Sequence, residues 1–168
     1  MEPARDKLAE VTEMATAVET VSGSYDLDTT NVIGLLKAIA AGEAEGGRRL
    51  AQWAAMTSNP KLAETLRFIV VRENSHAELF SRRVSELGET VDIGVVPAEA
   101  AYLSMLADPA VAEQEKAACV LGGAEFFAEM EQRIEAGAYD PLTAKLLTWY
   151  VAEERDSQDR LRQTGVAA

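Results

Sequence analysis

Glu73 and His76 are the residues whose types and spacing point most directly to chemistry. They bound the segment Glu73-Asn74-Ser75-His76, and His76 is the one histidine in the chain. On a helix this spacing puts a carboxylate and an imidazole one turn apart on the same face, so that both can hold one metal ion. The motif is short and arises often by chance, and a lone histidine on an apolar face is more often a hydrogen-bonded core residue. The adjacent carboxylate favours the ligand interpretation of His76.

Three more glutamates, Glu43, Glu125 and Glu154, occupy comparable positions on three other predicted helices. Each lies in a stripe of mostly apolar residues at alternating three- and four-residue spacing, which is the pattern of a buried helix face. The stripe that contains Glu73 and His76 consists of Leu62, Leu66, Ile69, Glu73, His76, Phe80 and Val84. The pattern therefore predicts five polar side chains in the interior of the protein: Glu43, Glu73, His76, Glu125 and Glu154.

Buried carboxylates need compensation, because an ionised carboxylate without partners costs several kcal/mol even after relaxation. Four converging glutamates also repel one another. Arginines occur near the stripes but fall beside them rather than on them: Arg48, Arg49, Arg72 and Arg155. Retained protons or a multivalent cation would offset the charge. A metal is the simplest remedy, and oxygen-rich sites with one imidazole suit iron or manganese.

The elements that must position these residues are helices. We predict an N-terminal helical arm over residues 1–27, with its helix at 4–21, followed by a bundle domain over 28–168. The bundle helices are expected at 28–56, 60–87, 110–136 and 141–162, with a short helix at 98–106 in a long connection. Capping residues followed by proline, Asn59-Pro60 and Asp140-Pro141, start two of them. The predicted fold is all-α: two antiparallel hairpins joined by a crossover.

An internal repeat supports this layout. Residues 59–73 align without a gap on residues 140–154, and each segment reaches its glutamate at the same distance after the proline. Two amphipathic helices resemble each other in any case, but the shared cap and the matched glutamates favour a true repeat.

The segments Ala41-Gly42-Glu43-Ala44-Glu45 and Glu73-Asn74-Ser75-His76-Ala77 resemble the first hairpin of rubrerythrins and other ferritin-like proteins. The resemblance implies a ferritin-like four-helix bundle and two iron ions, with manganese as an alternative. Glu43, Glu73 and His76 would hold the first ion. Glu125 and Glu154 would hold the second, with Glu73 and Glu154 able to bridge.

The chain departs from this family at Ser157, where a second histidine would be expected, and it lacks a rubredoxin-like cysteine module. Glu129 or Asp156 would be the replacement ligand for the missing histidine. The favoured interpretation, however, is that each of these carboxylates is a solvated charge. Core packing is the favoured role of Tyr150, ahead of a hydrogen bond to a ligand or radical chemistry. Cys119 is expected to be a small core residue.

The favoured function is that of a di-iron, or manganese–iron, oxidoreductase acting on ferrous iron, O2 or peroxide. The alternative is a non-catalytic module with one metal or none that works through assembly or partner binding. Mineral storage in a shell is a third hypothesis. In each case we expect a homo-oligomer, a dimer or larger.

Composition excludes other classes. The net charge of −12 argues against a nucleic-acid partner, and the single cysteine rules out a disulfide framework. There is no apolar run long enough to cross a bilayer, and the N-terminus lacks the order of residues of a secretory signal. We therefore expect a cytoplasmic protein with no membrane partner.

Overall fold

The structure, a computed structural model, describes residues 31–96 and 98–166, so the predicted arm at 1–27 lies outside the described residues. Within these ranges the chain forms helices and no strand, which confirms the all-α class. The elements are α2 (Val32–Met56), α3 (Pro60–Glu86), the 3-10 helix η2 (Ala98–Ala107), α4 (Glu113–Val120), α5 (Ala124–Glu135) and α6 (Pro141–Arg162).

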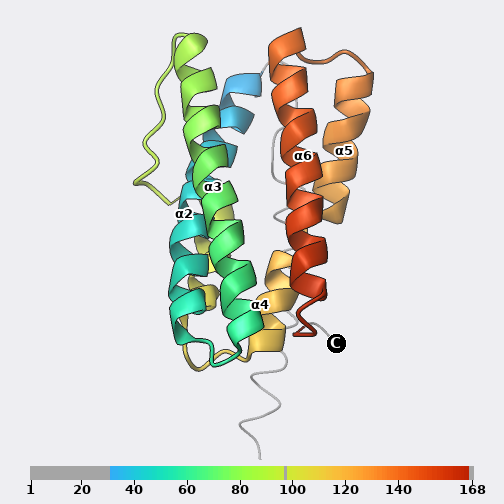
Figure 1. Ribbon diagram of the computed structural model, residues 1–168. Helices are drawn as coiled ribbons and strands as arrows, with labels where there is room; N and C mark the ends of the chain where they lie inside the picture. The colour runs from blue at the N-terminus through green and yellow to red at the C-terminus, as the bar shows by residue number, and fades with distance from the viewer. Residues whose placement is uncertain (1–30, 97, 167–168) are drawn as a thin grey trace, which may run out of the picture.

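Helices α2 and α3 form an antiparallel hairpin, and α6 packs alongside α3 (Figure 1). The predicted caps are confirmed: the Asn59 side chain accepts hydrogen bonds from the backbone N–H groups of Lys61 and Leu62 at the start of α3. Asp140 does the same for Leu142 and Thr143 at the start of α6. Each cap satisfies orphan donors of a first turn, which explains why these two helices begin at their prolines.

The prediction of one continuous helix over 110–136 is wrong. The chain leaves α4 at Val120 and begins α5 at Ala124, with Gly123 in the left-handed region at φ 84°. Gly122 and Gly123 are adjacent, and glycine is a poor helix former whose missing Cβ permits this conformation. The side-chain amide of Gln158 on α6 donates to the carbonyls of Val120 (3.3 Å) and Gly122 (2.9 Å), which satisfies acceptors at the break.

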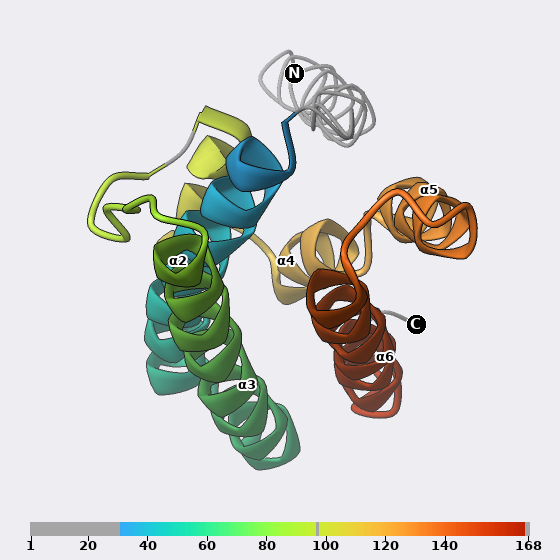
Figure 2. The ribbon, with the colours of Figure 1, turned by 90° about the horizontal axis from the view of Figure 1, so that it is seen from above.

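As a consequence of this break, α5 lies beside α6 on the side away from α3, while α4 lies between the two halves of the molecule (Figure 2). The short helix predicted at 98–106 is present as η2, which packs on α2.

Two apolar clusters form the described core. One contains Leu36, Ile39, Phe80, Phe127 and Leu147, and the other contains Leu50, Trp53, Leu66, Leu106 and Leu161. On each of α2, α3 and α6 a glutamate lies between the residues of the two clusters: Glu43, Glu73 and Glu154. The core is therefore interrupted by a polar layer.

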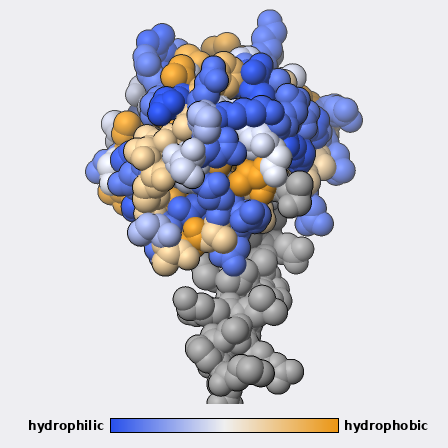
Figure 3. Space-filling model, turned by 60° about the horizontal axis from the view of Figure 1, so that its bottom comes forward, coloured by the Kyte–Doolittle hydropathy of each residue, from blue (hydrophilic) through white to orange (hydrophobic). Residues whose placement is uncertain are grey.

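The outer surface shown in Figure 3 is largely hydrophilic, with smaller apolar areas between the polar ones. None of the described helices combines the length and the apolar character that a membrane span requires.

Candidate metal centre

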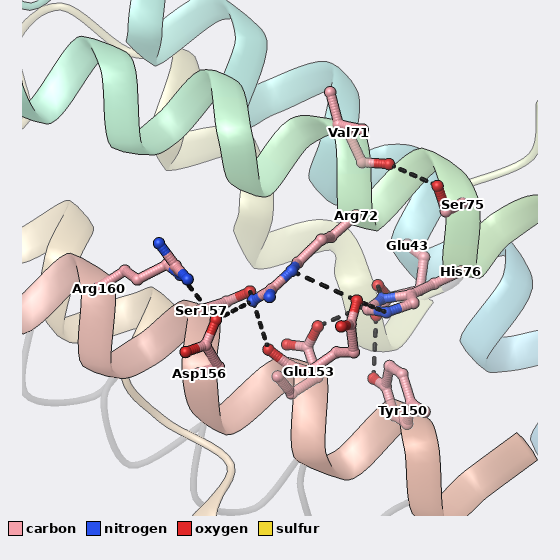
Figure 4. Close-up of polar contacts among 11 residues, drawn as sticks. Glu43, Val71, Arg72, Ser75, His76, Tyr150, Glu153, Asp156, Ser157 and Arg160 are labelled. Carbon is pink, nitrogen blue, oxygen red and sulfur yellow. Dashed lines mark hydrogen bonds and ion pairs between the residues drawn. The ribbon is translucent and has the colours of Figure 1, made fainter.

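The polar layer is built by three helices. Glu43 comes from α2, Glu73 and His76 come from α3, and Tyr150 and Glu154 come from α6. His76 has no exposed surface, and the side chains of Glu43 and Glu154 are 10% and 15% exposed. Figure 4 shows Glu43, His76 and Tyr150 pointing toward one another between the helices.

Three side chains of this layer offer donor atoms to one point. Nδ1 of His76 lies 2.9 Å from Oε2 of Glu43 and 3.3 Å from Oε1 of Glu154. One ligand atom from each of these residues lies within 4.8 Å of the other two. Two carboxylates and an imidazole at such distances form a partial ligand set for a transition metal.

Glu73 lies beside this group and lines the same cavity as Glu43 and Glu154. Its carboxylate packs against α2 at Gly46, where an added Cβ would lie 2.4 Å from Oε2 of Glu73 and would force the carboxylate to shift. Gly47 likewise leaves room for Asn74, whose Oδ1 would be 2.9 Å from an added Cβ. The close approach of α2 and α3 at this glycine pair holds Glu73 in the interior.

The pKa values of the buried groups are raised, so bound protons offset the negative charge of the polar layer when no metal is bound. Burial raises the pKa of Glu73 well above its ordinary range, and the charges of Glu43 and Glu154 raise it further. Burial and the charge of Glu43 raise the pKa of Glu154 to about 7. Burial alone would lower the pKa of His76, but the nearby carboxylates of Glu154 and Glu43 outweigh it and raise that pKa to about 9. A metal that binds here must displace these protons.

Buried polar atoms without hydrogen bonds also mark the site. Among the described residues, Oε1 of Glu154 and Nε2 of His76 have no hydrogen-bond partner. Oε1 of Glu154 lies within ion-pair distance of Nδ1 of His76, but the hydrogen bond of Nδ1 is made with Oε2 of Glu43. Nε2 faces Oε2 of Glu153 at 3.9 Å, the kind of outer carboxylate that often orients a metal-binding imidazole. A cation among Glu43, His76 and Glu154 would satisfy the buried carboxylate oxygen, so these residues fit a metal.

The structure does not bring Glu125 to this group. Glu125 lies exposed in the first turn of α5, and the prediction that it occupies a buried stripe is wrong. The reason is the break at Gly122-Gly123, which ends the periodicity on which the stripe was based. Glu129, which was weighed as a substitute ligand, is exposed and lies 3.6 Å from Arg133.

The residue at position 157, where the family resemblance implied a histidine ligand, contacts an arginine. Ser157 is buried, and its hydroxyl accepts a hydrogen bond of 3.2 Å from Nη1 of Arg72. Asp156 forms ion pairs with Arg72 and Arg160, in keeping with its interpretation as a solvated charge. Sequence reasoning missed Arg72, which lies beside the stripe of α3 but whose long side chain reaches α6. The internal repeat is the sequence feature that indicates this contact, because it aligns Arg72 of α3 with Glu153 of α6. These two residues form an ion pair of 3.3 Å.

Tyr150 also has a role that the packing interpretation understated. Its hydroxyl donates a hydrogen bond of 2.9 Å to Oε1 of Glu43. Its ring packs edge-on against the rings of His76 and Phe80, at centroid distances of 5.1 Å and 5.3 Å. Tyr150 therefore fixes both a carboxylate and the imidazole.

A cavity of about 140 Å³ adjoins the carboxylates. Glu43, Glu73, Glu154 and Tyr150 line one part of it, and apolar residues of η2, α4 and α5 line the rest, including Leu103, Leu106, Val120 and Phe127. Cys119 also borders it. Cys119 was predicted to be a core residue, but it is only half-buried and packs against the second apolar cluster; burial raises the pKa of its thiol to about 12, so the thiol is neutral.

Comparison of the chain with family models, with curated proteins and with solved structures finds no match.

Proposed function

We propose that this protein binds a redox-active transition metal in a ferritin-like helical arrangement, with Glu43, Glu73, His76 and Glu154 as ligands. One observation carries the proposal: carboxylates from α2 and α6 meet the imidazole from α3 in a nearly buried layer, with donor atoms within 4.8 Å of one another. Three carboxylates and one imidazole suit iron, with manganese as the alternative.

The proposed activity is that of an oxidoreductase acting on ferrous iron, O2 or peroxide. When bound, iron or manganese supplies one-electron chemistry toward small oxygen species. The chain's own residues prepare the site for it: Tyr150 orients Glu43, and Glu154 and His76 release protons as the ion enters. The cavity gives a small molecule access to the carboxylates, and its apolar walls limit the entry of water.

Metal loading followed by exposure to air tests this function. Metal-free protein mixed anaerobically with ferrous iron is expected to bind it tightly, and to oxidise it rapidly and saturably on addition of O2. Glu73→Ala and His76→Ala are expected to abolish both effects. Glu78→Ala is the matched control, because Glu78 lies on the same helix and its side chain is 76% exposed. Oxidation no faster than in buffer would refute the activity.

A second candidate is a module that binds metal without turnover and acts through assembly or partner binding. Two observations favour it: Glu125 is exposed, and Ser157 is engaged by Arg72, so the second predicted ion lacks its own ligands. Tight binding of iron with no acceleration of its oxidation would identify this function. Light scattering of the same samples would test the predicted homo-oligomer and would detect a shell.

A further inference from the structure

The centre is asymmetric in a way that the internal repeat makes visible. Glu73 and His76 lie one turn apart on α3, and the repeat aligns them with Glu154 and position 157 on α6. A symmetric centre would carry an imidazole at position 157 and a second metal beside Glu154. The chain has Ser157 there, and this hydroxyl is buried.

Arg72 is held at this position by several contacts. Its Nη1 lies 2.6 Å from Oδ2 of Asp156 and donates to the carbonyl of Glu153 and the hydroxyl of Ser157, each at 3.2 Å. Its Nε lies 3.3 Å from Oε2 of Glu153, and its guanidinium stacks on the ring of Phe68 at 4.5 Å. Figure 4 shows the side chain crossing from α3 to these residues of α6. With a side chain only 15% exposed, Arg72 is fixed in place.

These contacts leave few free ligand atoms for a second metal ion. A serine hydroxyl is a weak ligand, and this one is already engaged by a guanidinium. The carboxylates of Glu153 and Asp156 are committed to Arg72. A guanidinium keeps its charge at every physiological pH, so a divalent cation placed beside it would be repelled.

We propose that Arg72 takes the place of a second metal ion, so that the centre holds one resident ion per chain. The ion is bound by Glu43, Glu73, His76 and Glu154, and the guanidinium of Arg72 lies beside Ser157, where a second ion would need its ligands. This inference rests on the proposed function, since it presupposes metal binding. It departs from the two ions that the family resemblance implied.

Counting bound ions tests it directly. The full chain, freed of metal, is equilibrated with excess Mn²⁺, passed through a desalting column and analysed for manganese per chain, with electron paramagnetic resonance of the same sample. One ion per chain with the signal of an isolated Mn²⁺ is the expected result. Two ions per chain with exchange coupling would overturn the inference but leave the proposed function standing. No bound ion would overturn the proposed function and the inference with it.

A paired replacement tests the part played by Arg72. Arg72→Gln combined with Ser157→His removes the guanidinium and supplies an imidazole, while freeing Glu153 and Asp156; it is expected to raise the count from one ion to two. Arg160→Gln is the matched control, because Arg160 also pairs with Asp156 and stacks on Phe68, whereas the hydrogen bond to the Ser157 hydroxyl comes from Arg72. Circular dichroism establishes that each variant is folded. A folded double variant that still holds one ion would refute the role of Arg72, and the wild-type count remains decisive if the variant does not fold.

Discussion

Tyr150 and His76 contact opposite oxygens of the same carboxylate. The hydroxyl of Tyr150 donates to Oε1 of Glu43 at 2.9 Å, and Nδ1 of His76 lies 2.9 Å from Oε2. Glu43 is thus oriented from α6 and from α3 at once, although it belongs to α2. Metal affinity should depend on this orientation as well as on the ligands themselves.

Tyr150→Phe is therefore expected to weaken binding of Mn²⁺ by about 10-fold, the lower end of what loss of an outer hydrogen bond to a ligand usually does. Calorimetric titration of the metal-free protein measures it. Tyr139→Phe serves as the control, because the buried hydroxyl of Tyr139 has no hydrogen-bond partner among the described residues. Equal affinities in the two variants would show that the tyrosine hydroxyl does not orient Glu43.

The stability of the metal-free protein should fall as pH rises. Glu154 and His76 have pKa values raised to about 7 and about 9 in the folded protein, from ordinary values of 4.5 and 6.5. The folded state therefore binds more protons than the unfolded state in this range, so a higher pH favours unfolding. The contribution of Glu154 is complete below pH 4.5 and lost through about pH 7. That of His76 is complete below pH 6.5 and lost through about pH 9.

Thermal unfolding in the presence of a chelator is expected to show a fall in Tm of about 5–10 °C between pH 6 and pH 9.5. His76→Gln should remove the part of this fall above pH 7.5. Saturating Mn²⁺ should reverse the slope, because metal binding grows stronger as the protons leave. A Tm that rises with pH in the chelated wild-type protein would contradict the assignment of protons to this layer.

Much of the fold could be predicted because its signals are local. Asn59-Pro60 and Asp140-Pro141 start helices through hydrogen bonds made within a single turn, and both starts are confirmed. The end predicted for the first of these helices at residue 87 is also confirmed to within one residue, since α3 ends at Glu86 and Gly88 follows at φ 85°. Glu73 and His76 were found together because an apolar stripe on one helix specifies which of its residues are buried.

The errors arose where non-local contacts decide the structure. The stripe through 110–136 has helical periodicity, but Gly122-Gly123 and the amide of Gln158 stabilise a break that periodicity does not reveal. The role of Arg72 depends on a side chain that spans two helices, and a helical stripe describes only one helix at a time.

Gly46 should be indispensable for the position of Glu73. An exposed Gly→Ala change inside a helix normally stabilises it by about 1 kcal/mol. At position 46 the added Cβ would collide with the buried carboxylate of Glu73, so Gly46→Ala is expected to destabilise the protein by about 1–3 kcal/mol and to weaken metal binding. Chemical denaturation and metal titration measure the two effects. Gly34→Ala is the control on the same helix: its added Cβ would lie 2.3 Å from Oδ1 of Asn31, but that side chain is exposed and can turn away, whereas the carboxylate of Glu73 is buried. A stabilised Gly46→Ala protein with unchanged affinity would show that Glu73 has room to move.

Glu125 and Glu154 were both predicted, from their places in apolar helical stripes, to bind the second ion, but the structure places them differently. Glu154 lies 3.3 Å from Nδ1 of His76 in the polar layer, whereas Glu125 is exposed on α5. Glu154→Ala should therefore reduce Mn²⁺ affinity by at least about 10-fold, while Glu125→Ala should leave it within about 2-fold of the wild type. Parallel calorimetric titrations measure both, and Glu129→Ala, a change of another exposed carboxylate on α5, sets the baseline for a surface charge. A large loss of affinity in Glu125→Ala alone would mean that α5 moves inward when the metal binds. That result would restore the fourth helix to the site and remove the basis for assigning the ion to α2, α3 and α6.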